Sequence, residues 1–235
     1  GTISATDVGT YYTDFIPKMK YVFPNGTKKI YTAAWTIGKA AGSITLSEYS
    51  GEVKIKFTRQ FTVSRIGDGA ISVTSSNKKI ATTSISGNVV TVTGVGVGSA
   101  IITVSVAADK NHFATSATYS VTSSKTQITI PTVTNTTKTF SGSAQSPTIY
   151  YNPSDSLVTR TGTTSATNYS PSAYSFTYAI IDKSAYEWSD GTTTNKTFYW
   201  YINKKFFIQP KQTNTLRFNG TFQVPTWNFG ATNLI

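Results

Sequence analysis

The chain repeats part of its own sequence, and this repetition constrains the fold more than any other feature. Aromatic, turn and strand residues near the N-terminus recur at one constant spacing in the second half of the chain. The matched pairs are Tyr21 with Tyr186, Phe23 with Trp188, Asn25-Gly26-Thr27 with Asp190-Gly191-Thr192, Trp35 with Trp200, and Ile37 with Ile202. Residues 4–7 match residues 165–168 at a slightly shorter spacing. The chain therefore carries two copies of one module.

A second match shows that a third copy begins before the C-terminus. The pattern Phe140-x-Gly142-x-x-Gln145-x-Pro147-Thr148 recurs as Phe218-x-Gly220-x-x-Gln223-x-Pro225-Thr226. We interpret residues 124–206 as the complete copy, residues 1–38 as the C-terminal part of a copy and residues 207–235 as the N-terminal part of another. Residues 39–123 form a segment of a different kind.

Alternating apolar and polar residues predict an all-β chain. This alternation is clear at 71–74, 90–93, 102–106 and 119–122, and Gly, Asn or Ser clusters bound each run. No stretch has helical periodicity with caps. We expect tandem β-sandwiches of seven to nine strands at 39–123 and 124–206, with an incomplete sandwich at each end and short linkers at 38–42 and 123–125.

Two segments of residues 39–123 resemble the group 2 bacterial immunoglobulin-like family. They are Ile71-Ser-Val-Thr-Ser-Ser-Asn-Lys-Lys-Ile-Ala-Thr and Val90-Thr-Val-Thr-Gly-Val-Gly-Val-Gly-Ser-Ala-Ile-Ile-Thr-Val-Ser-Val. The repeated module is similar to the immunoglobulin-like repeats that alternate with such domains in long surface and phage-associated proteins of Gram-positive bacteria. Both resemblances imply immunoglobulin-like sandwiches and a structural role outside the cell.

The strand and turn patterns predict particular core and turn residues. We expect Val90, Val92, Ile102, Val104 and Ile80 to form the first core, and Trp188 or Trp200, Tyr186, Phe176 and Ile202 to form the second. Asn-Gly and Asp-Gly dipeptides tolerate positive φ at both central positions of a tight turn. Asn25-Gly26 and Asp190-Gly191 are therefore expected to make tight hairpins, and Trp35 and Trp200 to lie mid-strand as core anchors.

The composition argues against an enzyme. The chain has no Cys and a single His, His112, so it lacks thiolates and the His pairs of common catalytic metal sites. His112 lies in a polar segment between two predicted strands, where a catalytic base would not be sheltered. The ten carboxylates are dispersed. We expect no catalytic residue, no metal site and no cofactor.

Positive charge is the one strong electrostatic feature. The formal net charge is +11, and the Lys doublets at 28–29, 78–79 and 204–205 are spread over the modules. Solubility and protection of strand edges account for such lysines, and attraction to anionic cell-wall polymers or glycans is the functional alternative. The chain has no nucleic-acid-binding motif, and no apolar run approaches the roughly 18 residues of a membrane span.

These observations favour a non-enzymatic structural segment of an extracellular fibre, a cell-surface protein or a virion appendage. A carbohydrate- or receptor-binding adhesion module is the alternative. For that alternative, an exposed planar patch of Tyr150, Tyr151 and Trp227 would provide the contacts, whereas burial of all three would favour the structural role.

The two partial copies are complementary. By the repeat, they cover the module except for positions 158–161, and neither part alone can close a sandwich. We expect head-to-tail pairing of residues 207–235 of one copy of the chain with residues 1–38 of the next. The expected inter-subunit contacts are Tyr11, Phe15 and Trp35 with Phe218, Phe222 and Trp227. Excerpting from a longer covalent array and closure within one chain are the alternatives.

Overall fold

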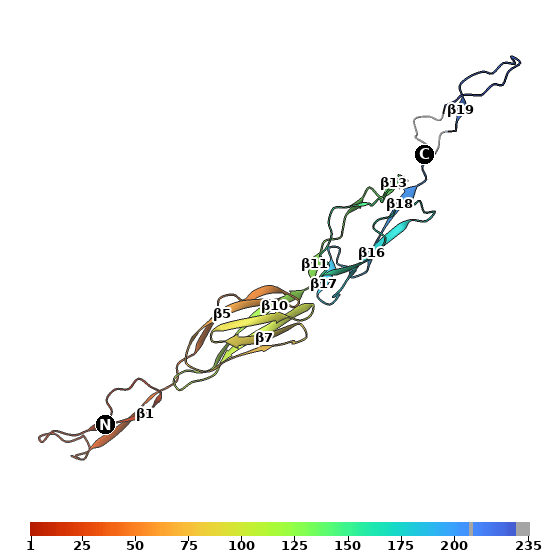
Figure 1. The fold of residues 1–235 in the computed structure, drawn as a ribbon. Helices are drawn as coiled ribbons and strands as arrows, with labels where there is room; N and C mark the ends of the chain where they lie inside the picture. The colour runs from red at the N-terminus through yellow and green to blue at the C-terminus, as the bar shows by residue number, and fades with distance from the viewer. Residues whose placement is uncertain (207–208, 229–235) are drawn as a thin grey trace. The chain divides into compact units, whose positions relative to one another are not determined.

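A computed structural model describes residues 1–206 and 209–228, and all the regular structure in these residues is β-strand. The predicted all-β class is confirmed. The chain divides into two compact units. The first contains Gly1–Gln127 together with Asp182–Glu187, and the second contains Ile128–Ile181 and the chain from Trp188 onward (Figure 1). No helix in the described part of the chain is long and apolar enough to cross a membrane.

Residues 43–124 form a sandwich of two four-stranded sheets, with strand orders β3-β5-β8-β7 and β4-β10-β9-β6. Neighbouring strands are antiparallel except β4 and β10, which run parallel with Ser120 opposite Ser50. The strands are β3 (Ser43–Leu46), β4 (Ser50–Lys54), β5 (Thr58–Ile66), β6 (Ile71–Ser75), β7 (Ala81–Ser86), β8 (Val89–Gly94), β9 (Gly98–Val106) and β10 (Thr115–Ser124).

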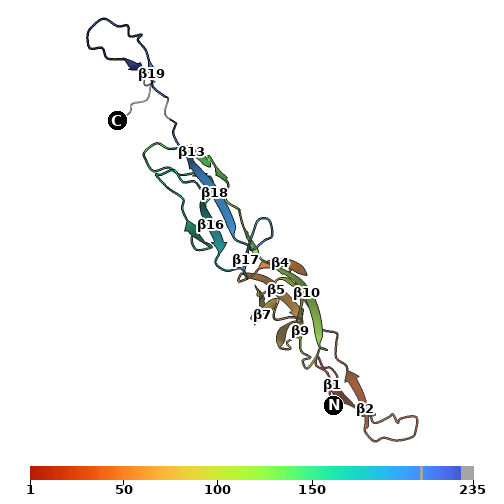
Figure 2. The ribbon, with the colours of Figure 1, turned by 90° about the vertical axis from the view of Figure 1, so that its right-hand side faces the viewer.

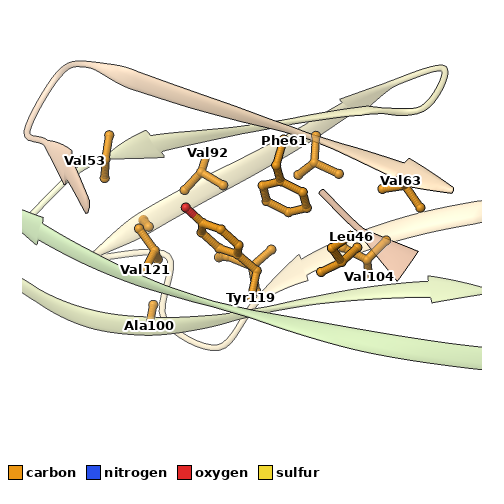
Figure 3. Packing of buried hydrophobic residues seen from close by; sticks show 12 residues of the cluster. Leu46, Val53, Phe61, Val63, Val92, Ala100, Val104, Tyr119 and Val121 are labelled. Atoms are coloured by element: carbon orange, nitrogen blue, oxygen red, sulfur yellow. The ribbon is translucent and has the colours of Figure 1, made fainter. Parts of the chain in front are cut away.

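The core of this sandwich lies between the two sheets and consists of the inward residues of each alternation. Val90, Val92, Ile102 and Val104 are completely buried, as predicted. The Phe61 ring stacks on the Tyr119 ring with 4.4 Å between centroids, and Figure 3 shows the two rings among the surrounding valines. Ile80 was expected in the core but is only half-buried. It precedes β7 in a turn, so it packs against the core from outside the strand.

Residues 124–206 are the complete copy, which we also call the second or complete module. It contains a four-stranded sheet of order β13-β18-β16-β15 and two strand pairs, β11-β17 and β12-β14 (Figure 1). β13 runs parallel to β18, and the other two pairings of the four-stranded sheet are antiparallel. The strands are β11 (Thr126–Ile128), β12 (Val133–Thr134), β13 (Thr137–Thr139), β14 (Thr148–Ile149), β15 (Val158–Gly162), β16 (Tyr174–Ile180), β17 (Tyr186–Trp188) and β18 (Lys196–Asn203).

Aromatic side chains fill the second core. Trp188, Trp200, Phe176 and Ile202 are buried, as predicted. The Phe176 ring stacks on Phe198 with 5.6 Å between centroids, on the same face of the sheet as Trp200. Tyr186 was also expected in the core but is half-buried, because it opens the short strand β17 directly after the turn at 182–185.

The predicted tight turns have a different geometry. Only the glycines take positive φ, at 77° in both Gly26 and Gly191, whereas Asn25 and Asp190 do not. In the second copy, Gly191 N–H donates to the Trp188 carbonyl at 2.8 Å, and Trp188 N–H donates to the Thr192 carbonyl at 2.8 Å. This pattern is a type I turn followed by a left-handed glycine. The expected hairpin between the flanking strands is wrong, because β17 pairs with β11, whereas β18 pairs with β13 and β16.

The Asp190 turn gives a pH-dependent prediction. Hydrogen bonds from Lys196 Nζ and from Thr192 lower the pKa of Asp190 to about 2. A carboxyl with a depressed pKa stabilises the fold above its unfolded pKa, near 3.9, and loses that contribution as the pH falls toward 2. Asp190→Asn keeps the acceptor for Thr192 N–H, as Asn25 does for Thr27, but removes the titrating charge.

We therefore expect the Asp190→Asn variant to lose less stability than the wild type between pH 4 and pH 2. The measurement is thermal unfolding followed by tryptophan fluorescence. Asp155→Asn, in another turn of the same module, is the matched control and should track the wild type. Identical pH profiles for the wild type and the Asp190 variant would contradict this assignment.

Strand pairs also form in the two partial copies. In the first unit, β1 (Gly9–Phe15) pairs antiparallel with β2 (Tyr31–Ile37), and Figure 2 shows the long loop that joins them. In the second unit, β19 (Lys211–Gln212) pairs antiparallel with β20 (Trp227–Asn228). Neither pair has a further strand beside it among the described residues.

Candidate assembly surfaces

One face of the β1–β2 hairpin collects apolar side chains. The register places Tyr11 opposite Trp35 and Phe15 opposite Tyr31. Because side chains alternate along a strand, the residues between these pairs on the same face also belong to it. We call this surface the hairpin face. It consists of Tyr11, Thr13, Phe15, Tyr31, Ala33, Trp35 and Ile37.

The hairpin face reproduces the ring geometry of β16 and β18. The Tyr11 and Trp35 rings lie 4.8 Å apart with 30° between their planes, and the Tyr174 and Trp200 rings lie 4.9 Å apart with 29° between their planes. Both tryptophans occupy equivalent registers, opposite these tyrosines. The first partial copy therefore folds as the corresponding strand pair of the complete module.

Hydrogen bonds to loop carbonyls are also repeated. Trp35 Nε1–H donates to the Thr2 carbonyl at 3.2 Å, and Trp200 Nε1–H donates to the Thr163 carbonyl at 2.8 Å. The hydroxyls of Tyr11 and Tyr174 each donate over 2.7 Å, to the carbonyls of Asp7 and Asn168. Residues outside the strands thus hold the tyrosine–tryptophan stack in the same way in both copies.

Burial separates the two copies. Phe15 is 50% exposed, whereas its counterpart Tyr178 is 1% exposed. Trp35 is half-buried, whereas Trp200 is fully buried. Beside the hairpin face lies an open hollow of about 540 Å³, lined by Phe23, Pro24, Asn25, Thr27, Lys29, Ile30 and Tyr31. The hairpin has the form of half a core without the half that covers it.

The segment at 211–228 reproduces a turn from the other half of the module. Gln223 Nε2–H donates to the Arg217 carbonyl and to Asn219 Oδ1, as Gln145 Nε2–H donates to the Thr139 carbonyl and to a serine hydroxyl. The glycines of the two turns have φ of 77° at Gly220 and 84° at Gly142. We call residues 211–228 the terminal loop.

The terminal loop exposes its aromatic residues. Phe218 is 97% exposed, Phe222 is 95% exposed and Trp227 is 49% exposed. By the repeat, Phe222 corresponds to Ala144, which is itself exposed in the complete module. The strand pairing of the terminal loop is also shifted by one residue from that of the complete module. Gln212 lies opposite Trp227, whereas in the complete module Val133 lies opposite Ile149.

The structure thus places the six candidate contact residues on two surfaces. Tyr11, Phe15 and Trp35 share the hairpin face, and Phe218, Phe222 and Trp227 lie on the terminal loop. Sequence reasoning missed four residues of the hairpin face: Thr13, Tyr31, Ala33 and Ile37. Alternation counted from Tyr11 and Trp35 would have found them.

Asp7 fixes the base of the hairpin to the first sandwich. Its carboxylate lies 2.5 Å from Lys110 Nζ and accepts a hydrogen bond from Asn111 Nδ2 at 2.9 Å, and Asn111 Oδ1 accepts from Val8 N–H at 2.9 Å. The hydrogen bonds from Lys110 and Asn111 lower the pKa of Asp7. Asn168 occupies this position in the complete copy, so the charge pairing is particular to the first one.

His112 serves the same loop. Asp109 accepts hydrogen bonds from the backbone N–H groups of Asp68, Asn111 and His112, and these bonds hold its pKa well below the usual range. The His112 ring Nδ1 lies 3.1 Å from the same carboxylate. His112 and Asp109 therefore order a turn. The described residues contain no group of three or more His, Cys, Asp and Glu side chains suited to a metal.

The aromatic residues of the carbohydrate alternative are all exposed: Tyr150 by 73%, Tyr151 by 41% and Trp227 by 49%. The burial expected for a purely structural role of these three side chains is therefore absent. Within the described residues, no ring contact joins them to one another. They are accessible aromatic side chains, and no contact arranges them as one platform.

Comparisons with known proteins found no matching family model and no matching curated protein. Among solved structures, the chain is similar to the S-layer protein SbsC. Domains 4 and 5 of that protein match with 21% identity over 52% of this chain and 73% of the other, with a TM-score of 0.30. Domains 4–9 match with 15% identity over 88% of this chain and 37% of the other, with a TM-score of 0.29. The protein rSbsC(31-844) matches with 16% identity over 87% of this chain and 33% of the other, with a TM-score of 0.33.

Proposed function

We propose that this chain is a non-enzymatic structural segment of an extracellular fibre or cell-surface protein, which joins to further copies by completing split immunoglobulin-like modules. In this proposal, residues 39–123 are a group 2 bacterial immunoglobulin-like domain and residues 124–206 are an immunoglobulin-like repeat. The supporting observation is the hairpin face, which repeats the β16–β18 ring geometry but is open where the complete module is covered.

The energetics of an open half-module favour association. A two-stranded hairpin is marginally stable alone, and a contiguous exposed apolar face marks an interaction surface. Burying one large apolar side chain such as Phe15 contributes roughly 1.5–3 kcal/mol. The hairpin face and the terminal loop differ in structure, so their contact is heterologous. Such contacts propagate when the rotation between copies does not close a ring.

Composition supports the non-enzymatic part of the proposal, and net charge supports a location at a cell surface. The chain lacks Cys, and its only His is engaged with Asp109 in a turn. The net charge of +11 favours attraction to anionic cell-wall polymers, which would hold such a segment at a bacterial surface.

Self-association of the full chain tests the proposal. We expect the average mass in sedimentation velocity to rise with protein concentration, and Phe15→Ser to suppress this rise because it removes an apolar side chain from the hairpin face. Tyr12→Ser is the matched control, because Tyr12 is 57% exposed on the opposite face of the same strand. A wild-type chain that stays monomeric at high concentration would overturn the proposal. Equal effects of the two substitutions would do the same.

A carbohydrate-binding module is the second candidate, and the exposure of Tyr150, Tyr151 and Trp227 favours it. In that case, a purified cell-wall polysaccharide would bind the chain, and Tyr150→Ala would weaken binding without changing self-association. Loss of binding in high salt but not in Tyr150→Ala would instead assign the attraction to the lysines.

A further inference from the structure

We propose that the hairpin face and the outer edge of β2 are the docking site for the terminal loop of a second copy of this chain. The docked residues 215–217 add a parallel strand to β2, with Leu216 opposite Ile37. This inference rests on the proposed function and specifies its contact. The repeat identifies the occupant, because the complete module shows which segment covers the equivalent strands.

The complete module provides the template for the pairing. β13 runs parallel to β18, with Thr137 opposite Tyr201 and Lys138 opposite Ile202. Tyr201 N–H donates to the Thr136 carbonyl at 2.7 Å. Transferred through the repeat, Thr215 lies opposite Thr36, Leu216 opposite Ile37 and Arg217 opposite Gly38, and Thr36 N–H donates to the Asn214 carbonyl.

The edge that would receive this strand is open. In the complete module β18 lies between β13 and β16, whereas β2 has β1 as its one neighbour among the described residues. An unpaired strand edge presents N–H and C=O groups that pair with an added strand, and alternate side chains then set the specificity.

A second contact is preorganised at Gln223. In the complete module, Gln145 and Ala166 exchange backbone hydrogen bonds of 2.8 Å and 3.0 Å. The counterparts are Gln223 and Ala5. The side-chain hydrogen bonds of Gln223 hold its turn in the same form as that of Gln145, so the backbone of Gln223 is shaped for this exchange before docking.

Side chains distinguish the contact from its surroundings. Pro225 corresponds to Pro147, which is buried, and Trp227 corresponds to Ile149, which is half-buried. Phe222 lies outside the contact, because Ala144 is exposed.

The docked segment also starts later than in the complete module. There Ser189 N–H donates to the Ile128 carbonyl at 2.8 Å, but its counterpart Pro24 has no N–H.

Cysteine cross-linking tests the register, and the natural chain contributes no thiol to the background. One full-length chain carries Thr36→Cys and another carries Thr215→Cys. Directly paired strand residues lie close enough for a disulfide, whereas a shift of two residues along a strand exceeds the limit of about 7 Å between Cα atoms. Ala34→Cys is the matched control, since it lies on the same exposed face of β2 as Thr36.

After mild oxidation of the mixed chains, we expect a disulfide-linked dimer from the 36 and 215 pair, and only background dimer from the 34 and 215 pair. Sedimentation of the reduced samples distinguishes a wrong register from a wrong proposed function. Self-association with equal cross-linking of both pairs would overturn the register and leave the proposed function standing. If the chains neither self-associated nor cross-linked, both the register and the proposed function would be wrong.

A single chain with both Thr36→Cys and Thr215→Cys tests the identity of the occupant. Disulfide-linked oligomers are the expected product. If this chain formed only an internal disulfide at monomer mass, the terminal loop of the same chain would be the occupant, and the second-copy assignment would be wrong. Circular dichroism of each reduced variant verifies that the β-structure is retained.

Discussion

Replacing Trp200 with alanine is expected to destabilise the second module by about 3–5 kcal/mol, the range for removing a large aromatic side chain from a core. The indole is fully buried, stacks on Tyr174 and donates from Nε1 to the Thr163 carbonyl at 2.8 Å. The substitution leaves a cavity and removes the donor to that carbonyl. Urea unfolding followed by hydrogen exchange of β16 and β18 measures the loss.

Trp35→Ala is the matched control for this substitution. It removes the same side chain from the same tyrosine stack, but Trp35 is half-buried on the hairpin face. In dilute solution we therefore expect a much smaller loss of stability. If the two variants lost equal stability, either the hairpin face would be covered in solution or burial would not explain the effect at Trp200.

The second large effect is expected in the first sandwich, where Tyr119→Ala should also cost about 3–5 kcal/mol. Tyr119 is fully buried between the two sheets, and its ring stacks on Phe61 with 18° between the planes. This sandwich contains no Trp, so hydrogen exchange of β5, β8 and β10 is a better measurement than fluorescence.

Tyr119→Phe separates the ring from the hydroxyl. The Tyr119 hydroxyl lies 3.5 Å from Glu48, but Arg59 holds the same carboxylate through hydrogen bonds of 2.9 Å and 2.5 Å and lowers the pKa of Glu48. The carboxylate therefore keeps its main partner, and we expect a loss of no more than about 1.5 kcal/mol. A loss equal to that of the alanine variant would show that the hydroxyl, and not the ring, stabilises the core.

The sequence predicted the strands and central core residues, because alternation reports directly which side chains face inward. Ile102 and Trp200 lie mid-strand and are buried, whereas Tyr186 opens its strand, Ile80 lies in the turn before β7, and both are half-buried. Alternation indicates the face but not the distance from the end of a core. The predicted turn geometry was wrong, because an Asp-Gly dipeptide does not reveal that Trp188 N–H donates to the Thr192 carbonyl.

The candidate surfaces were predictable in part. The repeat led to Tyr11 and Trp35, and the structure places their rings in contact. Phe222 is a candidate contact by sequence, and its counterpart in the repeat, Ala144, is exposed in the complete copy. The parallel pairing of β13 with β18 joins strands far apart in sequence, and no local pattern specifies its register.

The Phe176–Phe198 stack bears on how the chain selects one strand pair over another during folding. During folding, the N-terminal strands of the second module can pair with β16 and β18 or with the β1–β2 hairpin, which has a similar backbone form. The hairpin is farther away along the chain, but each doubling of loop length disfavours a contact by only about 0.6 kcal/mol. The hairpin, however, has Thr13 and Ala33 where β16 and β18 have the two phenyl rings. Pairing with the hairpin would lose that aromatic layer. This loss would cost several kcal/mol, because removing one ring from a core costs about 3–5 kcal/mol. The residues that differ between copies thus protect a repetitive chain from the domain swapping to which repeat proteins are prone.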